Sequence, residues 1–242
     1  MPPHPHGPAR PAALVFDVLD TLFPLGPLEW RFREAGVPRV LMARWRDHLL
    51  RDAFALALLG GERTFEDVAR GSLRDITGNQ IAPAAEDVVI DGLTRLEPRR
   101  EAATALAAAR GRGVRTAALG HGDDGDTRLL LERSGLPVEA VVGGDGLGAR
   151  RPSRGPYLAA ARALDVPPER LGLVTAHGWD AAGGRGAGLV TGWSAHLEGR
   201  FPSVFERPDV EGRDLAETVE LMLALPEWGG RESGGDRAAG VR

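Results

Sequence analysis

Short apolar runs that end at polar residues recur along the chain. Residues 12–16 form such a run, and Asp17 follows it directly. A run of this length with a polar tip is typical of a strand that is buried on both faces of a parallel sheet. The sequence predicts five such strands, at 12–16, 114–119, 138–142, 171–175 and 189–193.

Helical patterns alternate with these runs in the second half of the chain. They lie at 99–110, 127–134, 155–164 and 179–187. This alternation predicts an α/β fold, a doubly wound parallel sheet with helices on both faces. Ligands of such sheets bind at the carboxyl ends of the strands, so we expect the chemistry just after each run.

One stretch, residues 25–96, breaks the alternation. It carries helical patterns at 40–59 and 65–76 and no convincing strand. We interpret it as a helical cap inserted after the first strand, where it would cover the strand tips and exclude water. The core is then 12–24 with 97–225. The ends, 1–11 and 226–242, are expected to be disordered tails because they are rich in Pro and His or in Gly, Arg and Glu.

Composition excludes several kinds of chemistry. The chain has no cysteine, which removes disulfides, thiol nucleophiles and cysteine-ligated metals and favours a cytoplasmic location. All 30 positions counted as lysine or arginine hold arginine, so a lysine Schiff base is excluded. The net charge of −4 leaves no basic surplus for nucleic acid, and we expect neither a signal peptide nor a membrane span.

Residues 14–23 carry the most informative pattern. Asp17 stands at a strand tip, and Thr21 follows four residues later across a turn. An aspartate is ionised at neutral pH and can act as a nucleophile that forms an ester. The alternative is that Asp17 only caps the following turn.

This segment resembles the first motif of the haloacid dehalogenase superfamily. Residues 119–122, then Arg151-Pro152 with Tyr157, then 174–180 resemble its second, third and fourth motifs in the right order, over roughly residues 12–223. Four motifs at successive strand tips are specific for the fold. The resemblance implies a Rossmann-like core with an inserted helical cap.

Two positions separate phosphatases from dehalogenases within this superfamily. The phosphatase general acid would stand at Leu19, and the first carboxylate of the magnesium pair would stand at Ala176, which leaves Asp180 alone. Magnesium needs oxygen ligands, and a phosphate dianion near Asp17 needs a cation. We therefore argue against phosphoryl transfer, whereas halide can leave without a proton.

The resemblance to the 2-haloacid dehalogenase branch implies roles for the remaining motif residues. Asp17 would displace halide with inversion and form an ester, and Asp180 would orient or activate the hydrolytic water. Thr21 and Thr175 would hydrogen-bond carboxylate oxygens. Arg151 would replace the usual lysine as the site cation.

Other residues are expected to hold the substrate or the halide. Tyr157 would line the site, although a packing role is the alternative. Arg46, which follows Trp45 in the expected cap, would hold halide or carboxylate, although a solvated arginine is the alternative. The complete substrate-binding set is Leu19, Arg46, Gly120, His121, Tyr157, His177 and Trp179.

Gly120 and Arg151 make the second and third motifs degenerate, and Asp20 is a third departure, in the first motif. Gly120 lacks the hydroxyl that usually binds the substrate carboxylate, and Arg151 lacks the compact geometry of lysine. Asp20 replaces a glycine, so it either raises the pKa of a neighbouring carboxylate or turns away and caps the turn. For His121 and His177 we favour hydrogen bonding over a zinc site. Residues 123–126 lack the spacing of a calcium loop and are expected to cap the helix near Thr127.

The leading hypothesis is a metal-independent hydrolase without cofactor that resembles (S)-2-haloacid dehalogenases. Its partner would be a small 2-haloacid carboxylate, and the resemblance implies a homodimer. Two alternatives stay open: a hydrolase of this fold that acts on another small substrate, such as a phosphatase, and a non-catalytic binding protein on the same scaffold.

Overall fold

The sheet of this protein has six strands, all parallel, in the order β3-β2-β1-β4-β5-β6. The structure is a computed structural model that describes residues 7–61, 63–147 and 149–228. Asp17 of β1 pairs in register with Leu119 of β2, and Phe16 pairs with Val174 of β4. The tips of the three central strands therefore meet at one edge. The strands are β1 (Ala13–Asp17), β2 (Arg115–Leu119), β3 (Ala140–Val142), β4 (Leu171–Thr175), β5 (Val190–Ser194) and β6 (Val210–Gly212).

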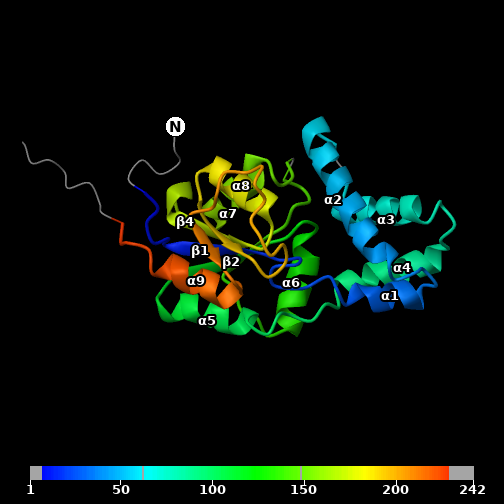
Figure 1. The fold of residues 1–242 in the computed structure, drawn as a ribbon, viewed down its shortest axis with the longest axis horizontal. Coiled ribbons are helices and arrows are strands. Elements are labelled where there is room, and N and C mark those ends of the chain that lie inside the picture. The colour runs from blue at the N-terminus through cyan, green and yellow to red at the C-terminus, as the bar shows by residue number, and fades with distance from the viewer. Residues whose placement is uncertain (1–6, 62, 148, 229–242) are drawn as a thin grey trace, which may run out of the picture.

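Helices cover both faces of the sheet, as Figure 1 shows. Alternate residues of β1 point to opposite sides: Leu14 and Phe16 belong to one apolar cluster, and Ala13 and Val15 belong to the other, which also contains Tyr157. The helices of this part are α5 (Ala102–Gly111), α6 (Asp124–Arg133), α7 (Arg154–Ala163), α8 (Gly178–Ala187) and α9 (Leu215–Leu223), with a short 3₁₀ helix at Pro168–Arg170.

The predicted α/β fold is confirmed, and each of the five predicted strands is present. The sequence reading missed β6, because Val210-Glu211-Gly212 has no apolar run that would mark a strand. The helix expected from residue 127 begins three residues earlier, at Asp124, because the Asp123 carboxylate caps it by accepting from the Gly125 backbone N–H at 2.6 Å. The expected capping role of this acidic segment is therefore confirmed.

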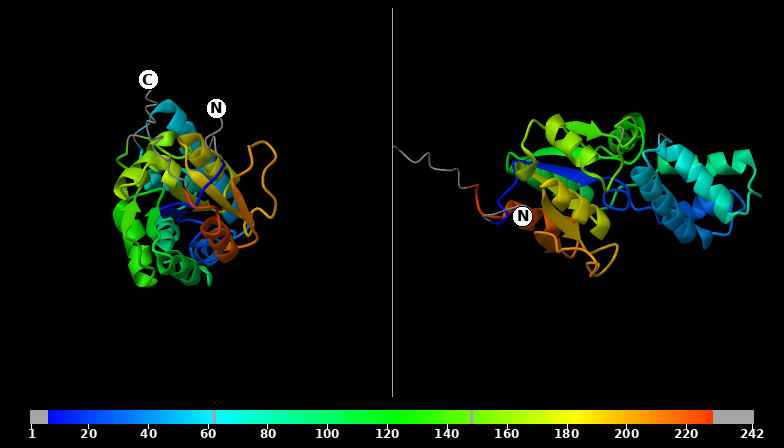
Figure 2. Two further views of the ribbon diagram at one scale, coloured as in Figure 1. Left: turned by 90° about the vertical axis from the view of Figure 1, so that its left-hand side faces the viewer. Right: turned by 90° about the horizontal axis from the view of Figure 1, so that it is seen from above.

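Four helices stand between β1 and α5 in the chain and lie beside the strand tips (Figures 1 and 2). We call α1–α4 the cap. They pack around buried Trp45, whose ring meets Phe32 edge-on at 5.6 Å and whose indole N–H donates to the Ala69 carbonyl. No strand occurs in the described part of 25–96. The helices are α1 (Leu28–Glu34), α2 (Leu41–Leu59), α3 (Phe65–Ile76) and α4 (Pro83–Leu93).

The two expected tails lie partly outside the described residues, at 1–6 and 229–242. Their described parts contact each other. The Arg10 N–H donates to the Pro226 carbonyl at 2.7 Å, and the Arg10 guanidinium pairs with Glu227 at 2.6 Å. Composition could not indicate this contact because it joins residues from opposite ends of the chain. None of the described helices is long and apolar enough to cross a membrane.

Candidate active site

Asp17 lies fully buried at the carboxyl end of β1 with a partner on each oxygen. The Thr21 hydroxyl donates to Oδ2 at 2.6 Å, and Arg151 Nη1 lies 2.8 Å from Oδ1. The Thr21 oxygen in turn accepts from the Ala176 backbone N–H at 2.9 Å. The turn after β1 and the tip of β4 therefore fix the orientation of the Asp17 carboxylate.

Arg151 joins the first strand tip to the fourth motif. The same Nη1 atom lies 2.9 Å from Asp180 Oδ2, so one nitrogen bridges two carboxylates. Tyr157 on α7 donates its hydroxyl to Asp180 Oδ1 at 2.6 Å. Asp180 is fully buried in the first turn of α8, where the helix dipole favours a negative charge. These residues form one connected network around Asp17.

Burial and neighbouring charges change the pKa values in this network. Burial raises the pKa of Asp180, and the Asp17 charge adds to the effect, although Arg151 opposes it. Burial lowers the pKa of Arg151, but the two carboxylates outweigh it and raise the value overall. Burial and the Asp180 charge raise the pKa of Tyr157. Arg151 and Tyr157 are therefore a permanent cation and a permanent hydroxyl donor.

The network leaves no room for a magnesium ion between the carboxylates. Magnesium needs near-octahedral oxygen ligands. Here both oxygens of Asp17 and both oxygens of Asp180 already have a partner, and Arg151 Nη1 occupies the position between them. Position 176 holds a buried alanine. The residues present do not fit a magnesium site. Over residues 7–61, 63–147 and 149–228, no group of three or more His, Asp or Glu side chains could share a metal.

Aromatic rings connect this site to the cap. Trp179 on α8 stacks with His177 at 5.1 Å and meets Phe54 of α2 edge-on at 4.9 Å. Phe65 of α3 stacks with His121 at 5.1 Å. Burial, followed by the Arg151 charge, lowers the pKa of His121 well below its usual value, so this ring is neutral. His177 Nε2 lies 3.9 Å from Asp17 Oδ2, beyond hydrogen-bond distance.

A cavity of about 380 Å³ separates the strand tips from the cap. Leu19, Gly120 and His121 line it from the core, and Phe65 and Leu93 line it from the cap. It lies directly beside the segment that carries Asp17. The cavity thus brings together three of the residues that were expected to bind substrate.

Carboxylates surround the mouth of this cavity. Glu66, Asp91, Asp123 and Asp126 contribute to its lining and are exposed. Burial raises the pKa of Asp126, and the charge of Asp123 adds to this rise. Arg70 also lines the cavity and pairs with Glu66 at 2.7 Å, so the remaining carboxylates leave a surplus of negative charge at the mouth.

Asp20 turns away from the nucleophile. Its Oδ1 accepts from the Leu25 backbone N–H at 3.0 Å, and its Oδ2 lies 3.5 Å from Arg46 Nη1 of α2. The backbone at Asp20 has φ 63°, the left-handed conformation that a glycine would adopt freely. Of the two alternatives for Asp20, the structure shows the turn cap.

Two expected ligands make other contacts in this structure. Arg46 pairs with Asp20 and is not among the residues that line the cavity, so its expected contact with halide stays a prediction. The Thr175 hydroxyl accepts from the His177 backbone N–H at 3.1 Å. Thr175 is the last residue of β4, and α8 begins at Gly178. The Thr175 hydroxyl therefore caps the turn that leads into the helix.

Comparison with known proteins assigns the chain to a family. A sequence model of haloacid dehalogenase-like hydrolases matches residues 12–188. The chain belongs to this family of hydrolases. The (S)-2-haloacid dehalogenase of Pseudomonas sp. strain YL is 26% identical over 216 residues, which cover 86% of this chain and 93% of that protein.

A second relative and a solved structure extend the comparison within the family. The phosphoglycolate phosphatase of Rhodospirillum rubrum is 28% identical over 216 residues, covering 88% of this chain and 82% of that protein. The L-2-haloacid dehalogenase from Xanthobacter autotrophicus, with chloropropionic acid covalently bound, superposes with a TM-score of 0.80 at 22% identity. That match covers 88% of this chain and 98% of the dehalogenase. The solved structure supports the family fold.

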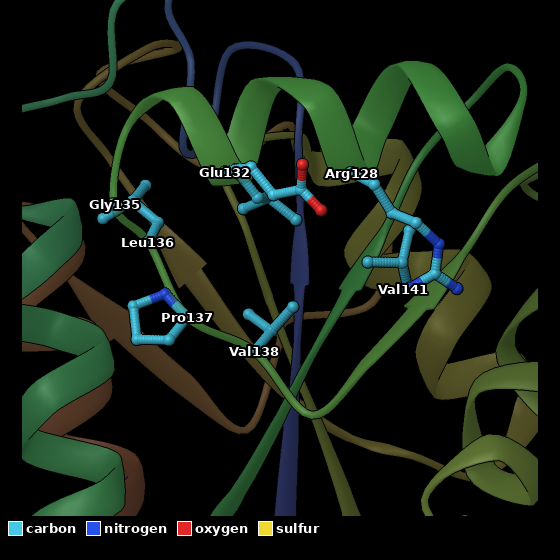
Figure 3. Close-up of a pocket in the computed structure, with 8 residues that line it drawn as sticks. Arg128, Glu132, Gly135, Leu136, Pro137, Val138 and Val141 are labelled. Atoms are coloured by element: carbon cyan, nitrogen blue, oxygen red, sulfur yellow. The ribbon is translucent and has the colours of Figure 1, made fainter.

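A second hollow lies outside this family site. Figure 3 shows that it is bounded by Arg128 and Glu132 of α6 and by the loop that leads to β3, with Pro137 and Val138. Its volume is about 350 Å³. None of the residues expected to act in catalysis or binding lines it. The residues that were expected to act lie at the strand tips and in the cap instead.

Sequence reasoning missed several residues that shape the site. Phe54 and Phe65 reach it from the cap, and Thr127 lines the cavity from α6. No motif marks them, because a phenylalanine or threonine on an amphipathic helix reads equally well as core or surface. Their location at the site follows only from the packing of the cap and of α6 around the strand tips.

Proposed function

We propose that this hydrolase releases halide from small 2-haloacids through an ester on Asp17, without a metal. The observation that carries the proposal is the bridge that Arg151 Nη1 makes at 2.8 Å to Asp17 and 2.9 Å to Asp180. A fixed cation lowers the repulsion between the nucleophile and a substrate carboxylate, which in a phosphatase would be the task of a metal. It also holds the two carboxylates close enough to act on the same ester.

Buried donors near this bridge support an anionic substrate. Arg151 Nε and Nη2 and Trp179 Nε1 are buried and have no acceptor within the described part of the chain. A buried donor without an acceptor costs roughly 1–3 kcal/mol, so such groups point to a missing partner. The Arg151 guanidinium lies 5.8 Å from the centre of the Trp179 ring, which places these donors in one region. A substrate carboxylate or a departing halide would satisfy them.

The first half-reaction needs no proton donor. A carboxylate oxygen of Asp17 attacks the carbon that bears the halogen, and the electron pair of the carbon–halogen bond leaves with the halide. Leu19 stands where a phosphatase of this fold would hold its general acid, and its side chain in the cavity wall is apolar. Halide is a stable anion, so the missing acid does not hinder its departure.

The second half-reaction regenerates Asp17. Asp180 takes a proton from water, and the resulting hydroxide attacks the Asp17 carbonyl carbon of the ester. The ester bond to the substrate oxygen breaks, and the 2-hydroxy acid leaves after its alkoxide gains a proton. Water thus supplies an oxygen to Asp17, and the net products are 2-hydroxy acid, halide and one proton.

The test is halide release from a panel that runs from fluoroacetate to 2-bromopropionate, in the presence of a chelator. Turnover that survives the chelator and is absent from Asp17→Asn supports the proposal. Asp180→Asn should release about one equivalent of halide and stop, with the ester visible by mass spectrometry. The absence of halide from every substrate would overturn the proposal.

The alternatives predict other outcomes in the same assay. The Rhodospirillum relative favours phosphoglycolate as a control substrate, and magnesium-dependent phosphate release would support a phosphatase. Binding of a 2-haloacid without turnover, in a protein whose Asp17 is dispensable, would support a non-catalytic role. The Arg151 bridge argues against the first of these, because it fills the position between the two carboxylates.

The proposal also includes a homodimer and a cytoplasmic location, both of which rest on the resemblance and composition. Sedimentation equilibrium of the purified chain would decide the oligomeric state. A mass of one chain over the working concentration range would contradict the dimer.

A further inference from the structure

A side chain at Gly120 would need the space that the Thr127 hydroxyl occupies. A Cβ atom built at Gly120 would collide with the Thr127 hydroxyl oxygen, and it would also meet Thr127 Cβ at 3.5 Å. The position that a serine or threonine would fill at the tip of β2 is therefore filled by a threonine from the next helix, α6. The chain lacks a hydroxyl at position 120 and supplies one to the same place from position 127.

The Thr127 hydroxyl has no other task in the structure. Thr127 is only 5% exposed, and within the described ranges its side chain makes no hydrogen bond. It lines the 380 Å³ cavity together with Leu19, Gly120 and His121. The hydroxyl oxygen is not among the buried side-chain atoms that lack a partner, so it is open to the cavity and free to donate to a ligand there.

Backbone donors stand beside this hydroxyl. Among the residues that the structure places, none accepts from the N–H of Leu19 or of His121. Both residues belong to the turns that follow the β1 and β2 strands, and both line the cavity with Thr127. Two N–H groups and one hydroxyl at a strand edge suit the two oxygens of a carboxylate.

We propose that Thr127 is a substrate-binding residue whose hydroxyl donates to the carboxylate of the substrate, in place of the side chain absent at Gly120. The inference rests on the proposed function for the identity of the substrate. It adds that α6 sets the specificity for a carboxylate, and that positions 120 and 127 are coupled, since only one of them can carry the hydroxyl.

The test measures binding of propionate, an unreactive carboxylate, together with KM and kcat for 2-chloropropionate. Thr127→Val removes the hydroxyl and keeps the shape, so we expect propionate binding to weaken and KM to rise by about 10- to 100-fold. The rate constant kcat should change less than about threefold, because Asp17, Arg151 and Asp180 are untouched. Thr127→Ser should bind like the wild type.

An exchange of the two positions separates ligand binding from structural support. Thr127→Ala opens the space beside Gly120, so adding Gly120→Ser to Thr127→Ala should restore propionate binding. Gly120→Ser alone should bind propionate more weakly than the wild type, because its Cβ collides with the Thr127 hydroxyl. Thr116→Val removes another buried, unpartnered hydroxyl, from β2, and serves as the matched control that should leave binding unchanged.

The outcomes distinguish this inference from the proposed function. Propionate binding that depends on Thr127 supports the inference even if no halide is released from any 2-haloacid. Equal propionate binding by wild type and Thr127→Val overturns it, even if halide release is confirmed. Absence of propionate binding to the wild type also overturns it.

Discussion

The hydroxyl of Tyr157 controls the charge of Asp180, and Tyr157→Phe tests this control with the loss of one oxygen atom. The hydroxyl donates to Asp180 Oδ1 at 2.6 Å, and both side chains are fully buried. Phenylalanine keeps the ring and its packing, so the change leaves no cavity around the ring. What remains is a buried carboxylate with one donor fewer.

The magnitude follows from the geometry. A hydrogen bond to a charged group contributes about 1.5–3 kcal/mol, and one pKa unit corresponds to about 1.36 kcal/mol. Without the Tyr157 hydroxyl, the pKa of Asp180, which burial already raises, should rise further, because the ionised carboxylate loses a hydrogen-bond donor. The free energy of unfolding at neutral pH should fall by about the same 1.5–3 kcal/mol.

The sign of the pH dependence is fixed by the same contact. The hydroxyl stabilises ionised Asp180, so its contribution is present above the pKa of this carboxyl and is lost as the pH falls through it. The difference in stability between Tyr157→Phe and wild type should therefore shrink in acid. In the activity profile, the acid limb should move to higher pH, because the base that accepts a proton from water must be ionised.

The assay is halide release from 2-chloropropionate between about pH 4 and pH 9, combined with urea unfolding at the two ends of this range. Thr116→Val is the control, because its hydroxyl is buried without a partner and its removal should be neutral or stabilising. If Tyr157→Phe leaves both the acid limb of the activity profile and the free energy of unfolding unchanged, the role assigned to the hydroxyl is refuted and Tyr157 only packs in the core.

Three further predictions address the charges around the site. Arg151→Met leaves the carboxylates of Asp17 and Asp180 buried without their cation, so urea unfolding at neutral pH should show a loss of about 3–5 kcal/mol. The loss should shrink near about pH 3, because protonated carboxyls need no cation, and an equal loss at both pH values would contradict the bridge. At Asp20, whose φ is 63°, Asp20→Ala should be about 1 kcal/mol less stable than Asp20→Gly in thermal unfolding, because only glycine adopts this backbone without strain; equal stabilities would show that the turn relaxes. Asp91→Asn at the cavity mouth should lower KM for 2-chloropropionate by about twofold at low salt and have no effect near about 0.5 M salt, since the charge acts through solvent; a salt-independent effect would mean direct contact.

The arrangement of strand tips explains how this chain manages without a lysine. A lysine ammonium is a compact point charge, whereas the Arg151 guanidinium is a planar fork with five donors. One of its nitrogens serves both Asp17 and Asp180, and its other nitrogens stay free of protein acceptors in the described structure. The substitution therefore keeps the bridge and leaves donors for an anionic ligand.

The sequence determined the fold and the identity of the central residues. Alternating apolar runs and helical patterns specify parallel strands, and the tips of neighbouring parallel strands meet at one edge. This local rule is sufficient to bring Asp17, Thr21, Asp180 and their neighbours together, as the structure shows. The short strand β6 was not predicted, because its three residues are too few to show a pattern of apolar and polar positions.

The tertiary structure decided everything that depends on where a side chain points. Asp20 could face Asp17 or turn away, and its choice depends on Arg46 and the Leu25 N–H, which the cap and the following turn provide. The hydroxyl missing at Gly120 is found at Thr127, a position that no motif marks. Strand tips are set by patterns within a few residues. Side-chain directions are set by packing between elements that lie far apart in the chain, and a single sequence does not encode that packing in any local pattern.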